Sequence, residues 1–117
     1  TLAKVDLIDS RETFSRRVET ASGPVVADFY LPQCGPCRRL APTIAQLAEE
    51  YQGRADFVRV DVEQTPDLAQ QFSIEKVPAI LLFRDGRKIQ TVTGAKAPEF
   101  YRKMINHALR VPKENSE

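Results

Sequence analysis

The sequence predicts an α/β domain, because short apolar segments of strand length alternate along the chain with longer segments of helical periodicity. One of the short segments, Pro24–Tyr30, carries apolar residues on both faces, as a strand at the centre of a covered sheet does. The length of 117 residues suits one domain with a substantial hydrophobic core. These features favour an α/β domain over a helix bundle or a β-sandwich.

The first half of the chain contains two predicted strands, each followed by a predicted helix. The first strand covers Lys4–Leu7, and the next helix has a capping-box-like start at Asp9 and Glu12. The second strand is Pro24–Tyr30. The second helix presents one apolar stripe, and Gly53 stands just past its end, where a helix-terminating glycine is expected. The residues of that stripe are Cys37, Leu40, Ala41, Ile44, Leu47, Ala48 and Tyr51.

A third strand and a short helix follow. The strand covers Ala55–Asp61, in which apolar residues surround Arg59. Thr65 and Pro66 have the residue types of an N-cap and a first helical position, so the third helix is expected to begin there.

The remaining elements are a hairpin and a last helix. Ala79–Phe83 reads as a buried strand, and Asp85 with Gly86 predicts a tight turn into a strand at Lys88–Thr93. Pro98 opens the last helix. The residues of this helix predicted to face inward are Phe100, Tyr101, Met104, Ile105, Ala108 and Leu109.

The chain shows no internal repeat and no linker long enough to divide it. We therefore expect one domain over residues 1–110, followed by a short, frayed polar tail at residues 111–117. The first residues lack the long apolar core of a signal peptide, so the chain as given is expected to carry none. Removal of a signal peptide before Thr1 stays open.

The composition argues against several classes of protein. The chain has 17 Lys and Arg against 16 Asp and Glu, and a net charge of +1 provides no electrostatic surface for nucleic acid or an anionic membrane. Its longest apolar run, Val77–Phe83, is far shorter than the roughly 20 residues that span a bilayer. Two cysteines are too few for a disulfide framework or a four-thiolate zinc site. We therefore expect no nucleic-acid, membrane or metal partner.

The chemistry of the chain is predicted to lie in the motif Cys34-Gly35-Pro36-Cys37, between the second strand and the second helix. A purely structural disulfide here would close a very small loop and contribute only about 2 kcal/mol. A metal site would need further ligands, and the other strong candidate is His107 on the last predicted helix, far along the chain. A redox-active pair explains the motif better.

The two cysteines are expected to differ in exposure. Pro36 suits the first helical turn, which places Cys34 at the helix N-terminus, where free N–H groups and the helix dipole favour a thiolate. Cys37 falls one turn later, on the apolar stripe. We therefore predict that Cys34 is the attacking nucleophile and that Cys37 resolves the mixed disulfide. Arg38 and Arg39 follow and could attract acidic substrates, although exposed charges near a helix start are ordinary.

Asp28 is the second unusual residue, because either face of its strand looks apolar. Burying a carboxylate is unfavourable, and the expected response is a raised pKa. One interpretation is a solvent-facing residue of an edge strand. The other is a buried acid–base group that takes the proton from Cys37 as that thiol resolves the intermediate.

In order and spacing, these residues resemble the thioredoxin family over nearly the whole chain, from about Val5 to Leu109. The segments that carry the resemblance are Val26-Ala27-Asp28-Phe29, Cys34-Gly35-Pro36-Cys37, Leu40-Ala41-Pro42, Val60-Asp61-Val62, Val77-Pro78-Ala79, Phe83-Arg84-Asp85-Gly86 and Gly94-Ala95. The resemblance implies a thioredoxin fold, with a five-stranded mixed sheet of order 1-3-2-4-5 flanked by four helices. It also implies that Pro78 is cis and packs beside the cysteines, which the frequency of cis X-Pro bonds alone would not support.

The family likeness further implies a shallow apolar groove that binds an extended substrate segment, with Val77 offering its backbone. The residues expected to form this groove are Gln33, Gly35, Pro36, Val77, Pro78, Thr93, Gly94 and Ala95.

Three positions depart from the family pattern. Gln33 stands where the family usually has Trp, and the chain contains no Trp at all. Tyr30 stands where a second Trp is common, and Arg59 replaces the usual Lys near the buried acid. We predict that Gln33 alters the choice of partner and shifts the redox potential, in a direction that the sequence leaves open. Arg59 stays charged, so it biases the pKa of Asp28 without relaying a proton.

The function implied by the resemblance is that of a protein-disulfide reductase, a thiol–disulfide oxidoreductase. It would hold no bound cofactor and would receive electrons from NADPH through a thioredoxin reductase. We expect a cytoplasmic monomer whose other partners are disulfide-containing proteins. Two alternatives are an oxidant or isomerase of an oxidising compartment and a non-enzymatic binding subunit on the same fold. Retention of Asp28, Pro78 and both cysteines argues against the binding subunit.

Overall fold

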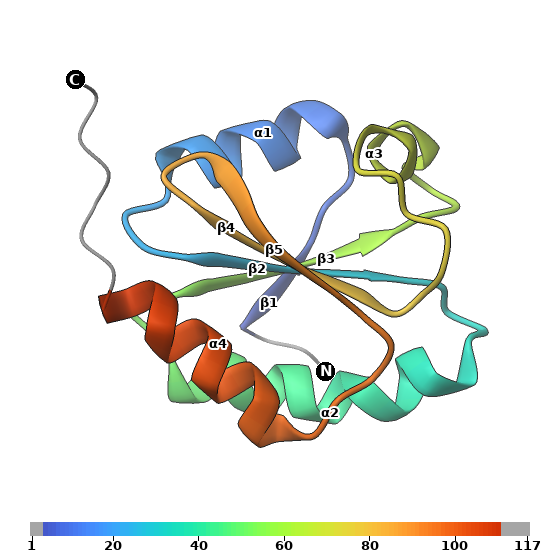
Figure 1. Cartoon of the computed structure of the whole chain (residues 1–117). Coiled ribbons are helices and arrows are strands. Elements are labelled where there is room, and N and C mark those ends of the chain that lie inside the picture. Colours follow the sequence, from blue (N-terminus) through green and yellow to red (C-terminus); the bar gives the residue numbers. More distant parts are fainter. Residues whose placement is uncertain (1–3, 111–117) are drawn as a thin grey trace.

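The computed structural model describes residues 4–110, which form one five-stranded sheet with helices on both faces (Figure 1). The strands are β1 (Val5–Leu7), β2 (Val25–Tyr30), β3 (Asp56–Asp61), β4 (Ala79–Arg84) and β5 (Arg87–Thr93). The helices are α1 (Arg11–Thr20), α2 (Gly35–Glu50), α3 (Pro66–Gln71) and α4 (Pro98–Arg110). The predicted frayed tail, residues 111–117, lies outside the described residues, so the boundary after residue 110 stays a prediction.

The sheet has the strand order β1-β3-β2-β4-β5, with β2 at its centre. Strands β1 and β2 run parallel to β3, whereas β4 runs antiparallel to both β2 and β5. The mixed sheet and the strand order implied by the family resemblance are therefore confirmed. The register matters for the site, because Asp28 on β2 lies directly beside Arg59 on β3.

The two faces of the sheet are covered by different pairs of helices. Helices α2 and α4 lie on one face, and α1 and α3 lie on the other (Figure 1). Along β2 the side chains alternate, so Val25, Ala27 and Phe29 join the core under α1 and α3. Val26 joins the core under α2 and α4. By the same alternation Asp28 points to the α2 face, the layer that also holds Cys37.

Most element boundaries agree with the sequence prediction to within one residue. The predicted tight turn is confirmed, because Asp85 and Gly86 have φ angles of 54° and 81°, the left-handed pair that a two-residue hairpin needs. Gly53 has a φ angle of 85° and lies two residues beyond Tyr51, the C-cap of α2. It was expected directly after the cap, so the helix stops slightly earlier than predicted.

The start of α1 differs from the prediction, and the start of α3 agrees with it. The N-cap of α1 is Ser10, whose hydroxyl accepts a hydrogen bond from the backbone N–H of Thr13 at 3.1 Å. The predicted start at Asp9 is therefore wrong by one residue. Thr65 does occupy the N-cap position of α3, but its buried hydroxyl donates to the carbonyl oxygen of Asp61 instead of capping the helix.

The predicted inward position of Phe100 is wrong. Its side chain is 42% exposed, whereas the neighbouring Tyr101 is fully buried and accepts a hydrogen bond from the backbone N–H of Lys96 at 2.9 Å. Tyr101 lies on the buried side of α4 with Met104, Ile105 and Ala108, whereas Phe100 lies outside that side. The buried hydroxyl of Tyr101 is thus hydrogen-bonded. The exposed ring of Phe100 packs against the Tyr101 ring in an edge-to-face arrangement.

The loop before β2 provides a stability prediction. A Cβ atom at Gly23 would lie 2.5 Å from the backbone carbonyl oxygen of Arg54, which leaves no room for any side chain. We expect Gly23→Ala to lower the free energy of unfolding by about 1–3 kcal/mol. Urea unfolding measures this, with Ser22→Ala at the exposed neighbouring position as control. Equal unfolding midpoints for the two variants would contradict the predicted clash.

Candidate active site

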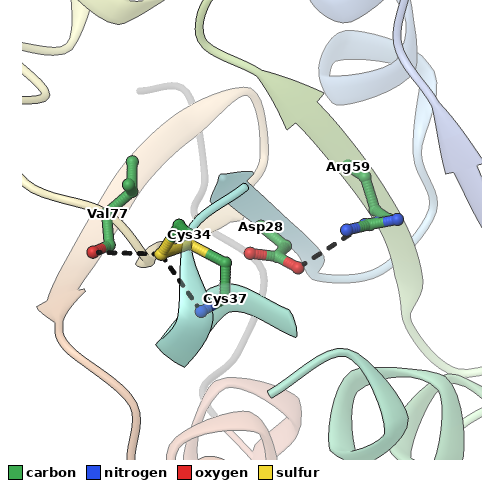
Figure 2. The surroundings of a disulfide bond; sticks show 5 residues. All are labelled: Asp28, Cys34, Cys37, Arg59 and Val77. Carbon is green, nitrogen blue, oxygen red and sulfur yellow. Dashed lines mark hydrogen bonds and ion pairs between the residues drawn. A yellow bond between two sulfur atoms is a disulfide. The ribbon is translucent and has the colours of Figure 1, made fainter. Parts of the chain in front are cut away.

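The two cysteines form a disulfide at the start of α2, immediately after the central strand β2 (Figure 2). Cys34 is the N-cap residue of the helix, and Pro36 occupies the first turn, where its missing N–H breaks no hydrogen bond. The backbone N–H of Cys37 donates to Cys34 Sγ at 3.2 Å. The predicted place of Cys34 at a helix N-terminus is confirmed.

The two sulfur-bearing residues differ in exposure, as the sequence predicts. Cys37 is only 2% exposed and faces the core under α2, whereas Cys34 is partly exposed. Cys34 is thus accessible to another molecule, whereas Cys37 is almost completely covered by the protein. This asymmetry suits a pair in which one sulfur meets a partner and the second acts from behind.

Asp28 is buried in β2, with an exposed fraction of 1%. Neither of its carboxylate oxygens has a hydrogen-bond partner among the described residues. Its ion-pair partner is Arg59, whose Nε lies 3.7 Å from Asp28 Oδ2. Burial raises the pKa of Asp28 from 3.8 to about 6, and the positive charge of Arg59 offsets only part of this rise. The predicted burial and raised pKa are confirmed, and the alternative of a solvent-facing edge residue is excluded.

Arg59 is held beside Asp28 by an aromatic ring. Its guanidinium carbon lies 3.7 Å from the centre of the Tyr30 ring, a cation–π distance. Tyr30 follows Asp28 by two residues on β2, so both side chains lie on the same face of the strand. This stack was not predicted. The signal for it is the two-residue spacing together with the β2–β3 register, and the register cannot be read from the sequence.

Figure 2 places the carboxylate of Asp28 between the disulfide and Arg59, with Val77 on the opposite side of Cys34. The carbonyl oxygen of Val77 lies 3.9 Å from Cys34 Sγ. The disulfide therefore has two distinct flanks. One is formed by Val77 and its neighbours, and the other leads past Cys37 to Asp28 and Arg59.

The Val77 flank contains the residues predicted for substrate binding. The Val77–Pro78 peptide bond is cis, as the family resemblance implies. Gly94 reaches this loop, because its backbone N–H donates to the carbonyl oxygen of Pro78 at 2.8 Å. The structure therefore brings together Cys34, Val77, Pro78 and Gly94.

The other predicted groove residues lie at the surface of the protein. Gln33, Pro36, Thr93 and Ala95 are exposed, and Gly35 is partly exposed in the first turn of α2. Within residues 4–110, no side-chain hydrogen bond ties Gln33 to the rest of the predicted groove.

The part of the chain that the structure describes contains no cluster of three or more His, Cys, Asp or Glu residues that could hold a metal ion. None of the helices between residues 4 and 110 has the length and apolar character needed to cross a membrane.

Comparison with known proteins shows that this chain is similar to thioredoxins. A family model for thioredoxin matches residues 5–107, a range that includes every residue of the site. Thioredoxin 1 of Synechococcus elongatus is 39% identical over 83 residues, which cover 71% of this chain and 78% of that protein. A thioredoxin of Staphylococcus aureus is 35% identical over 86 residues, covering 74% of this chain and 81% of that protein.

Solved structures show the same architecture. Mitochondrial thioredoxin 3 from Saccharomyces cerevisiae, in its oxidised form, superimposes with a TM-score of 0.82 at 27% sequence identity. That match covers 91% of this chain and 97% of the yeast chain. A thioredoxin from Malassezia sympodialis gives a TM-score of 0.81 at 30% identity, and the match covers 90% of each chain.

Proposed function

The chain belongs to the thioredoxin family and is a thiol–disulfide oxidoreductase that reduces protein disulfides, and we propose that Cys34 captures the substrate and Cys37 releases it. The contrast in exposure between the two residues supports this assignment, because only Cys34 can meet a disulfide on another protein. The helix N-terminus and the N–H of Cys37 both stabilise negative charge on Cys34 Sγ.

The reaction proceeds in two exchanges. The Cys34 thiolate attacks one sulfur of the substrate disulfide, so that a Cys34–substrate disulfide forms and the other substrate sulfur leaves as a thiolate that takes up a proton. Cys37 then loses its proton and attacks Cys34 Sγ, which releases the second substrate sulfur as a thiol. Two electrons have passed to the substrate. The protein is left with the Cys34–Cys37 disulfide drawn in Figure 2.

Asp28 is proposed to accept the proton of Cys37 in the second exchange. A carboxyl with a pKa of about 6 is about nine-tenths ionised at pH 7, so it is available there to accept a proton. Its pKa also lies near the operating pH, where general acid–base catalysis is most efficient. Its oxygens are free of other hydrogen bonds among the described residues. Arg59, permanently charged and close to Oδ2, limits how far burial can raise this pKa.

Substrate binding is assigned to the flank of Cys34 that carries Val77. An extended segment of the substrate would pair with the backbone at Val77. The nearness of the Val77 carbonyl to Cys34 Sγ and the hydrogen bond from Gly94 to Pro78 support this assignment. The exposed residues around this flank complete the proposed groove, namely Gln33, Gly35, Pro36, Thr93 and Ala95.

Gln33 is proposed to influence which substrates are preferred. Gln33→Trp adds an apolar wall next to Cys34, and we expect it to change the relative rates of reduction of different protein disulfides by about two- to tenfold. The measurement compares several protein substrates with a small disulfide that has no polypeptide to bind. Identical changes for all substrates, including the small one, would remove the support for a role in selectivity.

The protein's partners include a reductase and disulfide-containing proteins in general, and its redox group is its own disulfide. We propose that the reductase is a thioredoxin reductase that draws electrons from NADPH, and that the protein works as a monomer. A reductant of protein disulfides suits a reducing compartment, which supports the cytoplasm as its location. Its relatives also include a chloroplastic M-type thioredoxin from Chlamydomonas reinhardtii.

The direct test combines the protein with a thioredoxin reductase, NADPH and a disulfide-containing protein. We expect consumption of NADPH that requires all components and ends when the substrate is reduced. The second readout is the equilibrium of the Cys34–Cys37 pair with glutathione. No NADPH-dependent reduction, together with an oxidising equilibrium, would favour an oxidant instead.

A further inference from the structure

The flank of the disulfide opposite Val77 opens into a groove that substrate capture, as assigned above, does not use. Two hollows lie there, of about 340 Å³ and about 690 Å³. The smaller one begins at Cys37, and the larger one extends to β1 at the edge of the sheet. They share four lining residues and therefore adjoin, and we call the two together the arginine groove. The shared residues are Tyr30, Arg38, Ala41 and Arg59.

The charged side chains that line the arginine groove are all basic. Arg38 and Arg59 are the charged residues that line it, and no acidic side chain of the described part of the chain lines either hollow. Arg38 is exposed, and its guanidinium has no ion pair or hydrogen bond with residues 4–110. Arg59 pairs with the buried Asp28 and stacks on the ring of Tyr30. The charge of Arg59 is therefore balanced by Asp28, and Arg38 is the positive charge of the groove that the described residues leave without a partner.

The rest of the groove is apolar. Its wall on α2 is formed by Ala41, Pro42 and Ala45, and its far end carries Leu7, whose side chain is 62% exposed. An exposed leucine beside an aromatic ring and two arginines offers an apolar anchor next to a site for carboxylates.

We propose that the arginine groove binds an acidic, partly apolar segment of the protein whose disulfide is held at Cys34. Cys37, which is bonded to Cys34, lines the smaller hollow together with Arg38, so a polypeptide attached to Cys34 begins next to the groove. This inference rests on the proposed function. It adds a second contact surface, on the opposite flank from Val77, and a charge preference for the substrate.

Because the net charge of the chain is only +1, the whole molecule has little overall attraction for acidic substrates. Charges elsewhere on the surface nearly cancel, and salt screens exposed charges over about 10 Å at 0.1 M. Selection for acidic substrates must then come from Arg38 and Arg59 themselves and not from the overall field of the molecule.

The test uses two synthetic peptides that differ only in carrying Glu or Lys at the residues flanking one cysteine, which is joined by a disulfide to a small neutral thiol. The reduced protein is mixed with each peptide, and the ratio of the two rates of reduction is measured at low and high salt. We expect the acidic peptide to react about three- to tenfold faster at low salt, and the ratio to approach one at high salt.

Three variants show whether the groove itself selects the acidic peptide. Arg38→Glu is expected to abolish or reverse the ratio, whereas Arg38→Lys keeps most of it. Arg16→Glu makes the same change in net charge on α1, which packs on the other face of the sheet, and should leave the ratio unchanged.

Equal rates for the two peptides, or a ratio that Arg16→Glu lowers as much as Arg38→Glu does, would overturn the inference while leaving the reductase function intact. Failure of the protein to reduce either peptide would instead overturn the proposed function, and the inference with it.

Discussion

Replacing Cys34 with serine is expected to lower the rate of protein-disulfide reduction by at least about a thousandfold. A serine hydroxyl stays protonated at neutral pH and cannot attack a disulfide, and the sulfur of Cys37 is too buried to take its place. The measurement is the NADPH-coupled reduction assay. A circular dichroism spectrum serves as the folding control, because Cys34 lies at a helix cap and not in the core.

The two cysteines should behave as one unit. Cys37→Ser is also expected to stop turnover, but at the mixed disulfide instead of before it. The double variant Cys34→Ser/Cys37→Ser should be no slower than Cys34→Ser alone, because removing either partner already breaks the cycle. Additive losses for the two single changes would show that each cysteine acts independently, contrary to the two-step exchange.

The second large effect is expected from Asp28→Asn, through the dependence of stability on pH. The pKa of Asp28 is about 6 in the folded, oxidised protein against an ordinary value of 3.8, so the folded state binds this proton more tightly than the unfolded state. The resulting stabilisation is fully present below pH 3.8 and is lost as the pH rises through 6. A shift of this size corresponds to about 3 kcal/mol.

Asp28→Asn removes this titration. We expect its stability to gain up to about 3 kcal/mol relative to the wild type between pH 4 and pH 7.5, as measured by urea unfolding of the oxidised proteins. The comparison across pH cancels the fixed effect of placing an amide in the same site. Asp56→Asn, which removes an exposed carboxylate from β3, is the control. A wild-type-like pH profile for Asp28→Asn would contradict the raised pKa.

A kinetic readout separates the catalytic role of Asp28 from its effect on stability. If Asp28 accepts the proton of Cys37, Asp28→Asn should slow the release of the mixed disulfide near neutral pH and leave the attack of Cys34 nearly unchanged. An unaltered pH profile of release would refute the proton role even if the stability prediction holds.

Much of this structure could be predicted because its signals are local. The alternation of strand and helix patterns, the Asp85-Gly86 turn and the placement of Pro36 depend on residues close in sequence, and the structure confirms them. The apolar surroundings of Asp28 likewise pointed to its burial. The strand order and the cis bond before Pro78 could be predicted only from the family resemblance, since neither follows from residue types alone.

The features that were missed depend on contacts between distant residues or on competition between neighbours. The stack of Arg59 on Tyr30 requires the register of β2 against β3. Of the neighbours Phe100 and Tyr101, only Tyr101 is buried, and its hydroxyl accepts a hydrogen bond from the backbone N–H of Lys96, a contact that helical periodicity does not reveal. The arginine groove likewise exists only because α2 brings Arg38 beside Arg59 of β3.

Trapping of the mixed disulfide decides which cysteine attacks the substrate. Cys37→Ser protein in its reduced form is mixed with a disulfide-containing protein, and the products are separated without reductant and mapped by mass spectrometry. We predict a covalent adduct through Cys34 that a small thiol reverses, and none with Cys34→Ser. An adduct that forms only through Cys37, in protein lacking Cys34, would show that the roles of the two cysteines are reversed.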